Sequence, residues 1–176
     1  MSEVTGETGV AAFAFTGNTG CEVGDDVGEA MERVRGMRVS VCITANLSPL
    51  HWIQSETLRT AVPLITSLGI AIESTVIDRH TTTKRDAPSA TARVLGDLLP
   101  QSHQVVSERY GAPVSDHRVI LTCMSEMYEL SHTVRDLRLV ATGALILTDQ
   151  LARLENGLFT AAWLYRLYST TRAGGI

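Results

Sequence analysis

The chain has 176 residues, a formal net charge of −4, a pI of about 5.7, 44% apolar residues and 19% charged residues. That length is enough for one domain whose core needs neither disulfides nor a structural metal. The absence of a basic run excludes the electrostatic pattern of a nucleic-acid-binding protein, and no apolar stretch reaches the ~20 residues of a membrane-spanning helix.

The three cysteines, Cys21, Cys42 and Cys123, are odd in number and lack the CxxC spacing of a zinc knuckle or a disulfide framework. Cys42 and Cys123 lie in apolar runs, where a free thiol usually packs as a small hydrophobe. This usage fits a reducing compartment. The N-terminal segment MSEVTGETG lacks the basic and apolar regions of a signal peptide, so we expect a cytoplasmic protein.

The first part of the chain has the pattern of a strand, a helix and a second strand. Residues 1–9 read as a flexible lead, and the apolar run Val10–Phe15 predicts a buried strand. Apolar residues recur at helical spacing over Glu22–Val34, and acidic residues at its start complement the helix dipole. The β-branched segment Met37–Thr44 predicts the second strand.

The next segment predicts a long helix and a third strand. Ser48–Leu68 has a helical pattern, and Pro63 inside it predicts a kink or a restart. Ile70–Ile77 reads as a strand that ends at Asp78. The polar segment Arg79–Pro88, which includes His80, should be an exposed loop.

The patterns after this loop are less regular. Gln101–Tyr110 has a helical pattern, and Ala112–His117 reads as a loop. Val119–Leu137 has a helical pattern in its later part, although its first residues, Val119–Cys123, also fit a strand. The apolar run Leu139–Leu147 predicts a further strand.

The chain ends in an amphipathic helix over Leu158–Tyr168, and residues 171–176 read as a flexible tail. Strands that alternate with helices favour βαβ units and a parallel sheet. We therefore predict an α/β fold: a single three-layer domain over residues 10–170, with a mainly parallel twisted sheet and helices on both faces.

A glycine-rich passage, Thr16–Gly20, links the first predicted strand to the first predicted helix. Such a turn can hold a phosphate with backbone N–H groups, and TGNT is similar to the phosphate loop of flavodoxins. A tight strand-to-helix turn with glycines for backbone freedom explains it as well, and we favour that interpretation because short glycine motifs recur by chance.

Three residues of ligand type lie at comparable places in the predicted sheet. Asp26 lies in the first turn of a helix, Asp78 ends a strand, and His117 lies in a loop before an apolar segment. Each has an ordinary explanation by itself, namely helix capping, a turn or an exposed histidine. If they converge at one edge of the sheet, two carboxylates and an imidazole would suit a divalent metal such as nickel or zinc.

The order of these features resembles the hydrogenase maturation endopeptidases. The resemblance covers roughly residues 10–168 and rests on short pieces, namely AFAFTGNTGCEVGDDVG, STVIDRHTTTKRDAP, the Ser-x-His loop, LRLVATGALIL and ENGLFTAAWLYRL. The residues that match the family pattern are Gly17, Asn18, Asp25, Asp26, Gly28, Asp78, Ser115, Asp116 and His117.

The resemblance implies a hydrolase that removes the C-terminal extension of a nickel–iron hydrogenase large-subunit precursor. Asp26, Asp78 and His117 would then be the catalytic and metal-binding residues, with nickel supplied by the precursor or another divalent metal in its place. Gly17 and Asn18 would belong to the cofactor-binding turn. The metal could polarise the scissile carbonyl, and a carboxylate could activate the attacking water. The precursor would be the partner, with no nucleic acid and no membrane.

Two hypotheses from other classes stay open at this point. The chain could be a flavin- or phosphate-binding module of flavodoxin type that uses Thr16–Gly20, or a non-catalytic α/β interaction protein whose acidic residues are structural. Convergence of Asp26, Asp78 and His117 within a few ångströms would favour the protease, and their dispersal would favour the interaction protein.

Overall fold

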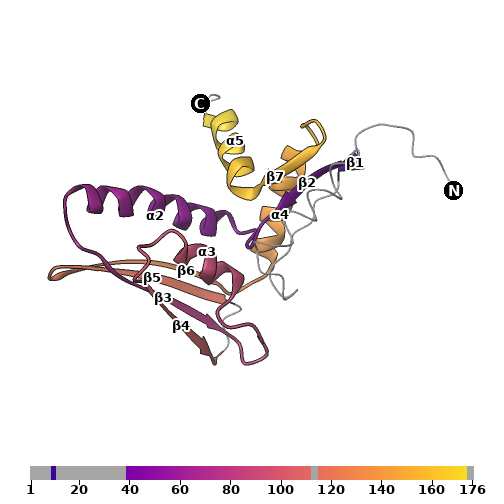
Figure 1. The fold of residues 1–176 in the computed structure, drawn as a ribbon. Coiled ribbons are helices and arrows are strands. Elements are labelled where there is room, and N and C mark those ends of the chain that lie inside the picture. Colours follow the sequence, from indigo (N-terminus) through magenta and orange to yellow (C-terminus); the bar gives the residue numbers. More distant parts are fainter. Residues whose placement is uncertain (1–8, 11–38, 112–114, 174–176) are drawn as a thin grey trace. The chain divides into compact units, whose positions relative to one another are not determined.

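The structure, a computed structural model, describes the residues in the ranges 9–10, 39–111 and 115–173 (Figure 1). The chain divides into two compact units. Unit 1 is built from the chain up to Leu47 and from Val140 onward, and unit 2 is the continuous stretch Ser48–Leu139. The α/β class is confirmed, and three of the five strand pairs in the described ranges are parallel. The single domain over 10–170 stays a prediction.

Unit 1 contains a three-stranded parallel sheet in the order β1-β2-β7. The Ser40 hydroxyl on the middle strand donates a hydrogen bond to the Glu155 carbonyl at 3.2 Å, just before the third strand begins. Among the described residues, the elements of this unit are β1 (Gly9–Val10), β2 (Val39–Ile43), α4 (Arg138–Leu151), β7 (Gly157–Thr160) and α5 (Ala161–Ala173).

Close packing around Gly143 shows why an apolar run predicted as a strand is a helix. A Cβ on Gly143 would overlap the Leu47 carbonyl oxygen, so only glycine allows α4 to approach this segment. The Tyr165 hydroxyl of α5 donates to the same carbonyl. The buried residues Gly143, Leu147 and Leu151 recur every four residues, which is a helical period. The strand prediction for Leu139–Leu147 was therefore wrong.

Unit 2 is a four-stranded mixed sheet in the order β4-β3-β5-β6. β3 pairs with β4 in parallel, while β3–β5 and β5–β6 are antiparallel. Its elements are α2 (Pro49–Ser67), β3 (Glu73–His80), α3 (Ala90–Gly96), β4 (Gln104–Arg109), β5 (Ser115–Cys123) and β6 (Glu126–Val134).

Two helices predicted in this region are strands. The helix predicted over Gln101–Tyr110 is β4, and the helical pattern of Val119–Leu137 is the β5–β6 hairpin. Met124 stands in the two-residue turn of that hairpin with a left-handed backbone (φ 58°), a conformation that such turns require. Pairing with β3 decided the outcome, because long-range strand contacts override a weak local helical pattern.

The core of unit 2 lies between one face of the sheet and two helices. α2 and α3 lie on the same side of the sheet in Figure 1, and both contribute to one cluster of buried side chains. α2 continues through Pro63 as one helix, so the predicted restart does not occur. No described helix is long and apolar enough to cross a bilayer. The buried members of the cluster are Leu58, Ile72, Val76, Ala92, Leu95, Leu99, Val119 and Leu121.

Candidate functional site

The helix-covered face of the unit 2 sheet changes from apolar to polar along its strands. Val76 of β3 lies opposite Val119 of β5, and both are fully buried. Two residues further along β3, still on the same face, Asp78 begins a polar row. The strand register places four polar residues side by side across the sheet, namely Ser107, Asp78, His117 and His132.

Asp78 has no solvent exposure, and one of its carboxylate oxygens has three protein donors. Oδ2 accepts hydrogen bonds from the Ser89 backbone N–H at 2.9 Å, the Ser107 hydroxyl at 3.2 Å and Nη2 of Arg109 at 2.9 Å. A guanidinium and two neutral donors thus replace the hydration that this carboxylate would have in water.

The other oxygen of Asp78 faces two histidines. Oδ1 accepts a hydrogen bond from the Ser89 hydroxyl at 2.7 Å, and lies 3.0 Å from Nε2 of His80 and 3.3 Å from Nε2 of His117. The rings of His80 and His117 meet edge to face, with their centroids 5.1 Å apart. The four residues Asp78, His80, Ser89 and His117, together with Arg109, are called the Asp78 cluster below.

The charges within the cluster follow from these contacts. Burial by itself would raise the pKa of Asp78, but hydrogen bonds from His117, His80 and Ser89 outweigh that effect and hold the pKa well below its usual range. Asp78 is therefore ionised at neutral pH. Burial lowers the pKa of His117 more than the neighbouring Asp78 raises it, so the neutral imidazole is favoured.

The hydrogen-bond pattern also indicates which nitrogen of His117 carries the proton. The single hydroxyl hydrogen of Ser89 is donated to Asp78, so Nε2 of His117 must supply the hydrogen for its own 3.2 Å contact with Ser89. Nδ1 of His117 has no hydrogen-bond partner within the described ranges. His117 is thus a neutral donor to the cluster.

The first two turns of α2 cover the polar row with polar side chains. The Gln54 amide donates to the backbone carbonyls of His117 at 3.1 Å and Leu130 at 3.0 Å. Nε2 of His132 lies 3.2 Å from the Ser48 hydroxyl. Burial and the nearby His117 and His132 lower the pKa of the buried His51 to about 3. Four of the five histidines in the chain are thus buried in unit 2, on or beside the polar row.

The loop that follows β3 is tied to the cluster. Lys84 Nζ lies 2.7 Å from a carboxylate oxygen of Asp86, and the Lys84 amide donates to the Thr81 carbonyl at 3.1 Å. Nη2 of Arg109, which also contacts Asp78, donates to the backbone carbonyl of Asp86. The loop therefore presents a partly exposed ammonium group a few residues beyond His80.

The predicted site residues have separate outcomes. Asp78 and His117 lie side by side, although His117 is in a strand and not in the predicted loop. Asp26, Gly17 and Asn18 lie outside the described residues. His80, taken as an exposed loop residue, is in fact the buried last residue of β3. The alternation of buried residues along β3 continues to His80, and that two-residue period is the signal that would have placed it.

The cluster favours acid–base chemistry over binding of a cation. Ligand atoms of Asp78, His80 and His117 lie within 4.8 Å of one another, which is a possible donor set for a divalent ion. Both oxygens of Asp78, however, already accept hydrogen bonds, and the Arg109 guanidinium 2.9 Å away opposes a second cation. An ionised carboxylate beside an imidazole is instead a common arrangement for proton transfer.

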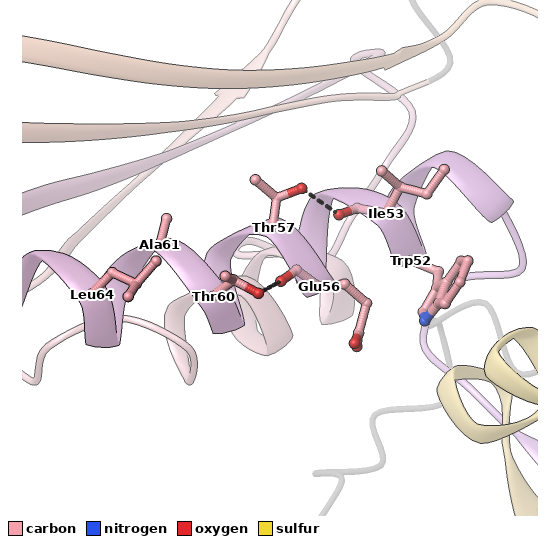
Figure 2. Close-up of a pocket in the computed structure, with 7 residues that line it drawn as sticks. All are labelled: Trp52, Ile53, Glu56, Thr57, Thr60, Ala61 and Leu64. Carbon is pink, nitrogen blue, oxygen red and sulfur yellow. Dashed lines mark hydrogen bonds between the residues drawn. The ribbon is translucent and has the colours of Figure 1, made fainter.

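A separate shallow groove runs along the outer side of α2 (Figure 2). The side chains of α2 that are buried, such as Gln54 and Leu58, belong to another face of the helix. The groove is mostly apolar, and two of its threonines use their hydroxyls on carbonyls of α2 itself. It therefore lacks the chemistry of the Asp78 cluster. Its lining residues are Trp52, Ile53, Glu56, Thr57, Thr60, Ala61 and Leu64.

Comparison with known proteins identifies the class of protein to which this fold and site belong. The family described as "Dihydrodipicolinate reductase, C-terminus" matches residues 53–163, which is more than half of the chain and includes the whole Asp78 cluster. The fold is similar to that of a dipicolinate-bound dihydrodipicolinate reductase from Paenisporosarcina sp. TG-14, with a TM-score of 0.60 and 12% identity over 82% of this chain and 61% of that one. The chain belongs to the dihydrodipicolinate reductase C-terminal family.

Curated relatives agree with this family. The 4-hydroxy-tetrahydrodipicolinate reductase of Clostridium novyi is 30% identical over 106 residues, which cover 48% of this chain and 42% of the relative. That of Cupriavidus pinatubonensis is 29% identical over 159 residues, 77% of this chain and 59% of the relative. The chain spans about half the length of the curated relatives that it matches.

These findings correct the functional interpretation drawn from the sequence. The matched family contains reductases, so the predicted hydrogenase maturation protease, its nickel or other divalent metal and its hydrogenase-precursor partner were wrong. The flavodoxin-like alternative gains no support either. The expectation of an enzyme is confirmed only at the level of the family. The short pieces misled because two of them, SDH and LRLVATGALIL, belong to a strand and a helix and not to a loop and a strand.

Proposed function

We propose that this chain forms the substrate-binding part of a reductase that acts on an unsaturated ring dicarboxylate related to 4-hydroxy-tetrahydrodipicolinate. The observation that carries the proposal is the family match over residues 53–163, because that region contains every member of the Asp78 cluster. The relatives are named as reductases of this compound, and the similar solved structure is described as dipicolinate-bound.

His80 is the proposed proton donor. Reduction of an unsaturated ring adds a hydride to one atom and a proton to another, so the site needs a group that can release a proton near neutral pH. Nε2 of His80 lies 3.0 Å from the carboxylate of Asp78, which orients the imidazole at the edge of the cluster. His117 already donates to the same cluster as a neutral imidazole, which makes it the weaker candidate.

Lys84 is the proposed partner of a substrate carboxylate. Its ammonium group is about a fifth exposed and lies in the loop directly after His80. The present contact with Asp86 at 2.7 Å shows that a carboxylate fits beside it. A dicarboxylate that exchanges with Asp86 would be placed with its ring near His80.

The hydride requires a separate donor, and a reduced nicotinamide dinucleotide supplies it in many reductases. The sheet β1-β2-β7 of unit 1 is parallel, which is the type of sheet at whose carboxyl edge dinucleotides bind. The glycine-rich passage Thr16–Gly20 lies outside the described residues. The role of unit 2 in this proposal is restricted to holding the dicarboxylate and delivering the proton.

A two-part measurement with a matched control tests the proposal. We expect the chain to bind dipicolinate in a calorimetric titration and to oxidise NADH or NADPH when 4-hydroxy-tetrahydrodipicolinate is present. His80→Gln should lower kcat by about 10²–10⁴-fold, the usual contribution of a general acid, and leave dipicolinate binding within about threefold. His103→Gln, which changes the one histidine that is not among the four buried in unit 2, should behave as wild type. Absence of both binding and turnover in the wild-type chain would refute the proposal.

A further inference from the structure

Arg109 connects the Asp78 cluster to the loop that follows β3. It is the last residue of β4 and stands opposite His80 in the parallel β3–β4 ladder. Its side chain is 18% exposed, although β4 is an edge strand. A cation with so little exposure at the carboxyl edge of two parallel strands needs specific partners.

Those partners lie on three different segments. Nη1 donates to the backbone carbonyls of Asp78 at 2.9 Å and Glu108 at 2.8 Å. Nη2 donates to Oδ2 of Asp78 at 2.9 Å and to the backbone carbonyl of Asp86. One planar group thus joins strand β3, strand β4 and the loop. Only a guanidinium has enough donors in a fixed plane to make this set of contacts.

Arg109 is also the permanent positive charge beside Asp78. A guanidinium is a permanent cation, whereas burial lowers the pKa of the neighbouring His117. The buried carboxylate of Asp78 therefore has a fixed positive partner 2.9 Å away.

We propose that Arg109 is a positioning residue that fixes the loop of residues 81–88, and with it Lys84, relative to Asp78 and His80. This inference rests on the proposed function for its consequence in binding, but the link between the loop and the cluster stands on geometry alone. Arg109 acts through the Asp86 carbonyl and the Asp78 carboxylate, and it is given no contact with the substrate. Its effect should therefore appear in dicarboxylate affinity and in the mobility of the loop.

The test compares three variants of the full chain. Arg109→Lys keeps the charge but loses the planar fork, and Arg109→Gln loses both. Arg118→Lys is the matched control, because Arg118 is an arginine of the neighbouring strand β5 whose guanidinium pairs with Glu129 on the other face of the sheet. We expect both Arg109 variants to weaken dipicolinate binding by about tenfold or more and to speed amide exchange in residues 81–88. Arg118→Lys should change each by less than about threefold.

The outcomes separate this inference from the proposed function. If wild type neither binds dipicolinate nor shows turnover, the proposed function is lost, and faster loop exchange in Arg109→Lys still supports the positioning role. Wild-type affinity and unchanged loop exchange in Arg109→Lys would overturn the positioning role of Arg109. If the Arg109 variants do not fold, amide exchange in the wild-type chain tests the inference instead. The Lys84 amide, which bonds to the Thr81 carbonyl, should exchange slowly without any ligand. Exchange at the rate of an unstructured peptide would overturn the proposal.

Discussion

The covered face of the unit 2 sheet has two halves that the same strands build by different physical means. The apolar half, around Val76 and Leu121, is held by the removal of apolar surface from water, which has no preferred direction. The polar half, around Asp78 and His117, is held by hydrogen bonds of defined length and angle. Val76 and Asp78 are only two residues apart, so a shift of register would exchange burial for exposure in both halves.

This difference explains why one half supports stability and the other supports chemistry. An apolar core tolerates changes of shape at a moderate cost, because each contact is weak and replaceable. A buried carboxylate tolerates no missing partner, because each unpaired donor or acceptor loses its hydration without compensation. The six contacts around Asp78 make its position rigid, and rigidity is what a proton-transfer site requires.

The largest effect should come from removing the charge at the centre of the polar half. Asp78→Asn keeps the size of the side chain but leaves the Arg109 guanidinium without its counter-charge in a mostly buried site. We expect a loss of about 3–5 kcal/mol in the free energy of unfolding, measured by urea denaturation. A loss below 1 kcal/mol would show that the pair is well hydrated in solution.

A slightly smaller loss of stability is expected from a substitution in the apolar half. Leu121→Ala removes a fully buried side chain and leaves a cavity beneath α2 and α3. The free energy of unfolding should fall by about 2–4 kcal/mol, while the affinity for dipicolinate stays within about twofold of wild type. A large loss of affinity together with preserved stability would contradict the separation of the two halves.

The polar half should also make the protein sensitive to acid. Burial lowers the folded-state pKa of His51 to about 3, so the unfolded chain, with an ordinary histidine, takes up the proton first as the pH falls. Neutral His51 therefore makes its full contribution to the free energy of unfolding above about pH 6.5, and that contribution is lost as the pH falls toward 3. His51 alone should lower the free energy of unfolding by about 2 kcal/mol between pH 6.5 and pH 5. Urea denaturation at the two pH values measures this loss, and His51→Gln should reduce it.

The smallest effect is expected on the other face of the sheet. Arg118 and Glu129 form a two-point ion pair across β5 and β6, but both side chains are about a third exposed. Water and salt screen such pairs, so Glu129→Gln should leave the urea midpoint unchanged. A clear fall in the midpoint would indicate that this face is covered by something in solution.

The sequence predicted the α/β class and brought Asp78 and His117 under consideration together, but through a mistaken arrangement. His117 was expected in a loop, whereas the β3–β5 pairing places it directly opposite Asp78. That pairing joins residues far apart in the chain, and no local pattern contains it. His80 was set aside because the polar residues after it predict a loop, although the alternation of β3 continues one step beyond Asp78.

Helix and strand were confused for a similar reason. Leu139–Leu147 is apolar at almost every position, so its period is ambiguous until Gly143 is seen against the Leu47 carbonyl. Arg109 was not singled out because its role depends on two carbonyls and a carboxylate that only the folded chain brings together. Networks of this kind are a property of the tertiary structure.

The most direct test of the central proposal is a titration of the chain with dipicolinate, followed by NMR of labelled histidine and lysine side chains. We expect saturable shifts of His80 and Lys84, with the resonances of His103 unchanged, because the dicarboxylate should bind beside the Asp78 cluster. The absence of a saturable shift at both His80 and Lys84 would contradict the assignment of the Asp78 cluster as the substrate site.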